Sequence, residues 1–94
     1  MKEKSIVLII GKIDFAFNVS LALYNEFVDA IQATSKTVPA TNFVRRALAD
    51  KAQLAALNEL IGQGLAVDIA GKLIEEFRPK VEIELKKSDG ASSN

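Results

Sequence analysis

Apolar and polar residues alternate with several different periods along this chain, and each period predicts a different element. The most regular pattern runs from Leu65 to Pro79, where Leu65, Ile69, Leu73 and Phe77 recur every four positions. This spacing places the four side chains on one face of an α-helix. Further apolar residues complete the same stripe: Ala66, Ala70 and Ile74. Pro79 ends the helix because it has no N–H and restricts the residue before it. A helix with one apolar face needs an apolar partner surface, which other segments must supply.

The N-terminal region has the pattern of a β-hairpin. Residues 4–10 are mostly apolar and β-branched, and residues 13–19 alternate between apolar and polar, which is the period of a half-buried strand. Gly11-Lys12 separates the two runs and fits the central positions of a type II′ turn. We therefore expect strands at 4–10 and 13–19, with the aromatic face of the second strand toward the core.

A first helix is expected over residues 21–32. Ser20 is placed to cap it, and Val19 and Tyr24 occupy the positions of a hydrophobic staple around that cap. The expected buried stripe consists of Leu21, Tyr24, Phe27, Val28 and Ile31. Pro39 is expected to close the loop that follows.

Two further helices are expected between Pro39 and the Leu65–Pro79 helix. Thr41 is placed to cap a short helix at 42–49. Asp50 and Gln53 then have the spacing of a capping box variant and predict a helix at 51–61.

Two glycines carry separate expectations. Gly62 is suited to end the second of these helices in a left-handed conformation. Gly71 lies inside the Leu65–Pro79 helix, where it costs about 1 kcal/mol relative to alanine. A close crossing within the chain would explain Gly71, and so would a contact with a partner.

After Pro79 the period changes to two, because Val81, Ile83 and Leu85 alternate with charged residues. This pattern predicts a strand, and the natural partner for it is the hairpin. The expected fold is α+β: the N-terminal β-hairpin plus this C-terminal strand form a small antiparallel sheet, packed against about four helices. We expect one domain over residues 1–87 and a disordered tail at 88–94, which is short and polar.

Composition excludes several kinds of chemistry. The 94 residues include 12 basic and 12 acidic side chains, no histidine and no cysteine. Disulfides and thiolate metal sites are therefore excluded, and the commonest general base is missing. The balanced charge argues against nucleic acid as a partner. The apolar run at Ile6–Ile10 is too short for a signal peptide or a membrane span, so the default is an intracellular protein without membrane contact.

No catalytic, cofactor-binding or metal-binding residues are expected. The carboxylates of Glu75 and Glu76 are adjacent on a helix and diverge by about 100°, so they form a solvated face rather than an acid/base pair. Arg45-Arg46 favours ordinary surface ion pairs, with a protein interface as the alternative. The phenylalanines alternate with acidic and neutral residues, which favours core packing over RNA stacking.

The remaining route to function is contact with another protein through apolar surface. Leu48, Leu54, Ile61 and Val67 are expected to be partly exposed, because the helical half has more apolar residues than a thin sheet covers. With Phe43, Arg45 and Arg46 they form the candidate partner-binding set. The same surface would serve self-association, and the residues alone do not separate the two.

The order of short motifs is similar to that of a known family. It includes Val38-Pro39-Ala40 with Asn42-Phe43-Val44, then Ile69-Ala70-Gly71-Lys72, then Glu75-Glu76-Phe77 with Pro79. Across roughly residues 12–85 the chain resembles the small tail assembly chaperones of tailed phages and prophages. It departs from them at Thr41, where that family commonly has histidine.

The resemblance implies a non-enzymatic protein of the host cytoplasm without a cofactor. Its partner would be the tape measure protein, a long helical chain with apolar stretches, which such chaperones hold soluble until tail tube subunits polymerise around it. The main alternative is a small structural or self-associating component of the phage tail or capsid. A regulatory or toxin-neutralising protein is a third class, and an enzyme has the least support.

Overall fold

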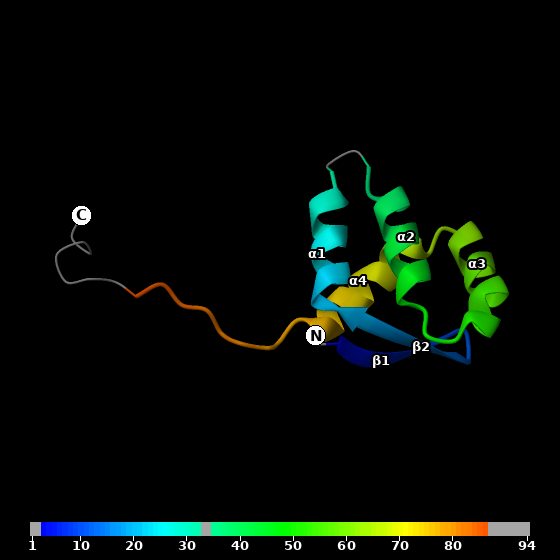
Figure 1. Ribbon diagram of the computed structural model, residues 1–94, viewed down its shortest axis with the longest axis horizontal. Helices are drawn as coiled ribbons and strands as arrows, with labels where there is room; N and C mark the ends of the chain where they lie inside the picture. The colour runs from blue at the N-terminus through cyan, green and yellow to red at the C-terminus, as the bar shows by residue number, and fades with distance from the viewer. Residues whose placement is uncertain (1–2, 33–34, 87–94) are drawn as a thin grey trace.

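The computed structural model of the protein describes residues 3–32 and 35–86, and the predicted disordered tail at 88–94 lies outside them. A two-stranded antiparallel sheet is covered on one face by helices (Figure 1). In chain order the elements are β1 (Glu3–Ile10), β2 (Ile13–Ser20), α1 (Leu21–Ala30), α2 (Thr37–Ala47), the short 3-10 helix η1 (Lys51–Gln53), α3 (Leu54–Gly62) and α4 (Ala66–Phe77). The predicted α+β class, the hairpin and the four helices are therefore confirmed.

The hairpin has the predicted strands but a different turn. Ile6 pairs with Phe17 and Leu8 with Phe15, and these side chains point toward the helices. At the turn, φ is +57° at Gly11 and +73° at Lys12. Positive φ at both central residues defines a type I′ turn, so the predicted type II′ turn is wrong. The I′ geometry matches the twist of the strands. It places Lys12 in the left-handed region, which is unfavourable for a residue with a side chain.

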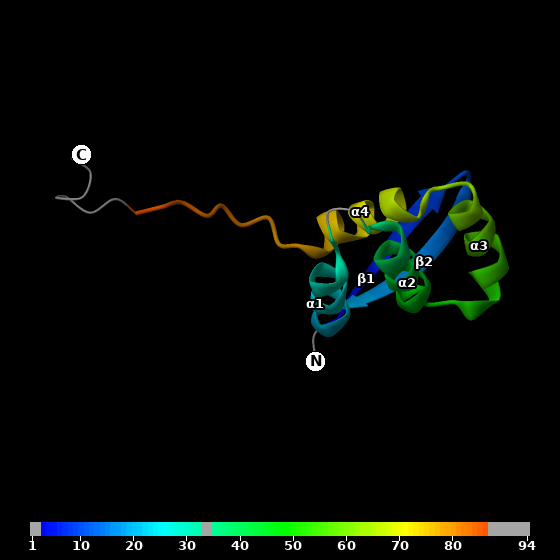
Figure 2. The same ribbon diagram turned by 90° about the horizontal axis from the view of Figure 1, so that it is seen from above.

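The core lies between the hairpin and helices α2, α3 and α4. Phe15, Phe17, Phe43, Leu57 and Leu73 are completely or almost completely buried there. The four-residue stripe of α4 is confirmed, since Ile69 and Leu73 are buried while Leu65 and Phe77 pack against the core. α1 and α2 stand side by side, and α4 crosses behind them (Figures 1 and 2).

Helix α1 is capped as predicted but is packed more loosely than predicted. The Ser20 hydroxyl accepts a hydrogen bond from the Leu23 N–H at 3.1 Å. No residue of α1 is fully buried, and Leu21 and Val28, both assigned to the buried stripe, are about half exposed. Leu23 packs against the core in their place. The difference arises because α1 lies at the side of the helical layer, where it meets mainly α2 and β2, with the Tyr24 ring packed against Phe77 of α4.

Helix α2 begins at Thr37, four residues before the predicted cap at Thr41. Pro39 lies in its first turn and does not close the preceding loop. A proline fits there because the first N–H groups of a helix have no intrahelical acceptor. Thr41 is therefore an internal residue of the helix.

The segment after α2 runs along the outer edge of β2. Leu48 bridges to Phe17, and the Ala49 N–H donates to the Ala16 carbonyl at 2.9 Å. Asp50 caps η1 by accepting from the Ala52 N–H. The expected reciprocal contact from Gln53 is wrong, because its side-chain amide donates to the Asp14 carbonyl at 2.8 Å. Edge groups of β2 are thereby satisfied.

The predicted role of Gly62 is wrong, and one of the two explanations for Gly71, a close crossing within the chain, is ruled out while contact with a partner stays a prediction. Gly64 is the left-handed residue after α3, at φ +90°, while Gly62 is the last residue of the helix. The Gly64 N–H donates to Ile61 and the Leu65 N–H to Leu60, which is a Schellman motif. Outside the backbone of its own helix, no described atom lies within 4 Å of the place where a Cβ of Gly71 would be, so a close crossing does not explain this glycine.

The predicted C-terminal strand is not formed. The sheet in the described part of the chain has only β1 and β2, and residues 79–86 have no strand pairing. This segment extends away from the domain (Figure 1), and Val81, Ile83 and Leu85 are 67%, 89% and 87% exposed. The alternating pattern is real, but nothing in the described part of the chain covers its apolar side chains.

Candidate protein-binding surfaces

The structure divides the predicted partner-binding residues between core and surface. Phe43 and Leu48 are each 2% exposed, so they serve the core, and the expectation that Leu48 is partly exposed is wrong. Leu54 and Ile61 on α3 are partly buried against the core, and Val67 on α4 is 43% exposed. The apolar surface that a partner could contact is therefore defined by the grooves between the elements and not by these residues.

Arg45 and Arg46 point to different neighbours. Arg46 forms an ion pair with Glu26 of α1, with both side chains more than half exposed. The Arg45 Nε donates to the Asn58 Oδ1 at 2.9 Å. Arg46 therefore confirms the prediction of a surface ion pair, which contributes no more than about 1 kcal/mol.

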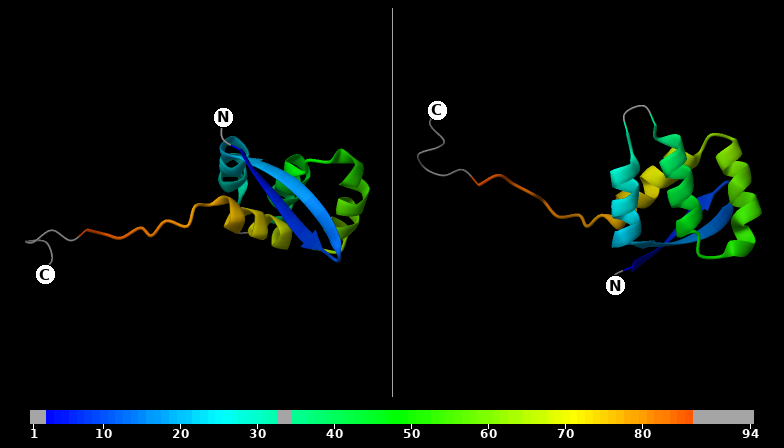
Figure 3. Two further views of the ribbon diagram at one scale, coloured as in Figure 1. Left: turned by 90° about the horizontal axis from the view of Figure 1, so that it is seen from below. Right: turned by 45° about the horizontal axis from the view of Figure 1, so that its top comes forward.

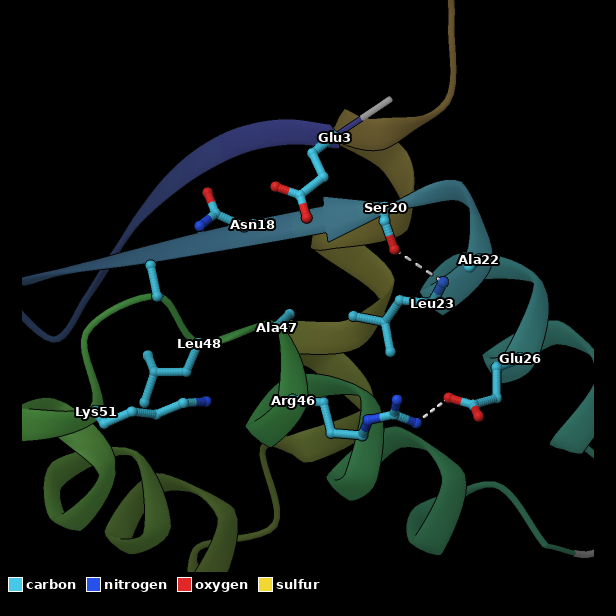
Figure 4. Close-up of a pocket in the computed structure, with 11 residues that line it drawn as sticks. Glu3, Asn18, Ser20, Ala22, Leu23, Glu26, Arg46, Ala47, Leu48 and Lys51 are labelled. Atoms are coloured by element: carbon cyan, nitrogen blue, oxygen red, sulfur yellow. Dashed lines mark hydrogen bonds and ion pairs between the residues drawn. The ribbon is translucent and has the colours of Figure 1, made fainter. Parts of the chain in front are cut away.

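A polar cavity of about 430 Å³ lies beside the Arg46–Glu26 pair, between the end of the hairpin, α1 and the α2–η1 connection. Figure 4 shows the two side chains directed toward each other and the Ser20 cap at the other side. Glu3 and Lys51 add one charge of each sign. Opposite charges balance here.

A second depression, the α1–α2 groove, is mainly apolar and has a volume of about 270 Å³. Its lining residues are Leu23, Glu26, Phe27, Ala30, Pro39, Asn42, Phe43 and Arg46. The rings of Phe27 and Phe43 stack within it, with centroids 4.7 Å apart. Because α1 buries no residue completely, its apolar side chains are left to line this groove.

A third depression, the β1–α4 groove, runs along the edge strand and has a volume of about 440 Å³. Its lining residues are Val7, Leu8, Ile9, Ile10, Leu65, Asp68, Ile69 and Lys72. One face of the hairpin is left uncovered by the helices (Figure 3, left), and Val7 and Ile9, which alternate with the less exposed Leu8 and Ile10, are 60% and 74% exposed. This is the largest run of exposed apolar side chains on the sheet.

The described residues contain little buried polar chemistry. None of their buried side chains is polar or charged, and they contain no cluster of acidic residues able to hold a metal ion. No helix among residues 3–32 and 35–86 is long and apolar enough to cross a membrane.

Sequence reasoning missed the lining of the α1–α2 groove except Phe43 and Arg46. The signal that could have revealed this groove is the number of apolar residues in α1, which is larger than one buried face of a helix can hold.

Comparison with known proteins gives one phage relative and one family. A protein from Haemophilus phage HP1 (strain HP1c1), described as an uncharacterized 11.3 kDa protein in the lys 3′ region, is 27% identical over 84 residues, which cover 89% of this chain and 82% of that protein. No solved structure matches significantly. A family described as phage tail assembly chaperone matches residues 6–87. Because this match spans most of the sequence, the chain belongs to the phage tail assembly chaperone family.

Proposed function

We propose that this protein binds the tape measure protein of a phage tail through the α1–α2 groove and keeps it soluble in the host cytoplasm during tail assembly. The observation that carries the proposal is a pair of neighbouring helices with an apolar groove between them, rimmed by the charged side chains of Glu26 and Arg46. Helical ligands bind in grooves of this kind, with their apolar anchors one turn apart. The family resemblance implies a helical partner.

The groove also has a suitable balance of rigidity and freedom. Its floor is fixed by the buried Phe43, which belongs to the core. One wall is α1, which buries no residue completely and so has room to adjust to an incoming helix. The exposed Arg46–Glu26 pair is weak, which allows a partner to displace it at low cost. The proposed role is contact and release, without an enzymatic step.

Co-expression with the tape measure protein of the same phage tests the proposal. The wild-type chain should increase the soluble fraction of the tape measure protein and co-purify with it. Ala30→Arg should abolish this effect, because a long cation would enter the apolar groove. Ala55→Arg is the matched control, since Ala55 is also an exposed helical alanine and does not line the groove. A tape measure protein that stays insoluble with the wild-type chain would refute the function.

The same experiment separates the function from its location. If Ala30→Arg and Ala55→Arg solubilise the tape measure protein equally well, the chaperone role stands and the α1–α2 groove is the wrong site. The structural alternative, a subunit retained in the tail or capsid, predicts this protein in purified virions, whereas an assembly chaperone should be absent from them.

A further inference from the structure

The C-terminal segment has the residue pattern of a β-strand, but its apolar side chains are exposed and it pairs with no other strand in the described residues. Residues 80–86 present Val81, Ile83 and Leu85 on one face and four charged side chains on the other. The three apolar side chains are 67–89% exposed. Such alternation fits a strand with one face buried. Within residues 3–32 and 35–86, no surface covers this apolar row.

The edge of β1 provides a matching surface. The outer edge of β2 is occupied by Leu48, Ala49 and Gln53, but in the described residues no backbone hydrogen bond reaches the outer edge of β1. β1 has eight residues, enough to pair with the whole segment. Unpaired edges of this kind are templates for another strand.

The β1–α4 groove beside that edge fits the side chains of the segment. Its inner wall consists of Leu8, Ile10, Leu65 and Ile69, which suits an apolar row. Asp68 and Lys72 stand on α4 at the same groove and carry one charge of each sign. The two lysines and two glutamates of the segment lie on its other face, so they would point away from the groove when the apolar row enters it.

The path of the chain directs the segment away from its own β1. α4 ends beside the start of β1, where the Lys4 Nζ donates to the Glu76 carbonyl at 2.6 Å. To pair with its own edge, the chain would have to reverse at once. Arg78 is extended (φ −72°, ψ 137°) and Pro79 has a fixed φ, which favours continuation in one direction. All views show the segment leaving the domain (Figures 1, 2 and 3).

We infer that residues 80–86 of one copy pair as a β-strand with the free edge of β1 in a second copy, and that their apolar side chains fill its β1–α4 groove. Reciprocal exchange uses the same two surfaces in both copies and closes a two-fold dimer. The sheet of each copy then has three strands, which a stable small sheet requires. The α1–α2 groove stays open, so this dimer is independent of the proposed function.

Truncation tests the inference directly. In size-exclusion chromatography with light scattering, the full chain and a chain ending at Lys86 should be dimers, and a chain ending at Pro79 should be a monomer. Unchanged far-UV circular dichroism of the helices would show that the shortened chain is folded. The inference would be overturned if the chain ending at Pro79 were a dimer. It would also be overturned if the full chain were a monomer at a concentration of about 0.1 mM.

Point substitutions and cross-linking locate the contact. Ile83→Asp should give monomers, whereas Glu84→Gln on the opposite face should leave the dimer intact. Because the chain has no cysteine, an Ile83→Cys chain and a Lys72→Cys chain with a different tag can be mixed and treated with a short bis-maleimide. A cross-linked heterodimer supports exchange. A chain with both substitutions can also be mixed with excess wild-type chain, so that most dimers contain only one substituted copy. If the cross-link within the substituted chain persists, the segment lies on its own domain and the exchange is refuted.

Discussion

Lys12 is the residue whose backbone conformation suits it least. Within the described ranges it is the only non-glycine residue with a positive φ. The left-handed region costs an L-residue about 1–2 kcal/mol. The unfavourable conformation of Lys12 is offset by the pairing of the hairpin, because the I′ turn keeps the two strands in register across all eight residue pairs.

Substitution of Lys12 by glycine should therefore stabilise the protein. We expect Lys12→Gly to raise the free energy of unfolding by about 0.5–1 kcal/mol, since relief of the strained φ exceeds the added entropy of the unfolded chain. Urea denaturation followed by circular dichroism measures the change. Lys12→Ala removes the same charge but retains the unfavourable φ, so it should give no comparable gain. Equal gains from both variants would assign the effect to charge.

Gly71 and Gly64 provide a second pair of opposite outcomes. At Gly71 a methyl group would meet open space inside α4, so Gly71→Ala should stabilise by about 1 kcal/mol through helix propensity. At Gly64 the space is equally open, but φ is +90°, so Gly64→Ala should destabilise by about 1–2 kcal/mol. Thermal unfolding compares the two. A loss of stability in Gly71→Ala would show that this position is packed after all.

At the scale of elements, α1 depends on its cap more than the other helices do. It has no fully buried residue, and the Ser20 hydroxyl satisfies one of its free N–H groups. Ser20→Ala should therefore cost about 1 kcal/mol, with faster hydrogen exchange concentrated in α1. Ser5→Ala removes another exposed hydroxyl and should stay within about 0.5 kcal/mol of wild type. Uniformly faster exchange throughout the protein would contradict a local role.

The elements also show which sequence signals are sufficient. The period-two pattern of 13–19 and the four-residue period of α4 predicted both elements well, because each apolar face meets a surface within the same chain. The pattern of 81–85 is just as regular, yet no strand forms. Periodicity reports which side chains need burial and says nothing about what buries them. Pro39 misled the prediction for a different reason, since a proline marks a helix start as well as a helix end.

The candidate surfaces were harder to predict than the fold, for a related reason. Leu48 and Val67 look alike in the sequence, but Leu48 bridges to β2 and is buried, whereas Val67 faces outward from α4. Which apolar residues remain uncovered depends on the path of the α2–η1 connection along β2. Local patterns do not specify that path, because it is fixed by contacts such as Gln53 to Asp14 across 39 positions of sequence.

At the scale of the whole molecule, charge is balanced and apolar surface is not. The chain has 12 basic and 12 acidic residues, and the ion pairs in the described part, Arg46–Glu26 and Lys72–Glu75, are on exposed side chains. Long-range attraction to a charged partner is therefore weak. The grooves along α1–α2 and β1–α4 are lined mainly by apolar side chains. Contact through them should be driven by removal of apolar area from water.

This difference predicts how the complex with the tape measure protein responds to salt. Raising NaCl from about 0.1 to 0.5 M shortens the screening length to roughly 4 Å and would weaken a complex held by charges. A complex held in the apolar α1–α2 groove should keep its affinity or gain slightly, because salt screens only the Arg46–Glu26 rim. Retention of the tape measure protein on the immobilised chaperone, measured over increasing salt in the wash, tests this. Release of most of the partner by 0.5 M NaCl would mean that charged side chains, and not the groove, hold the complex.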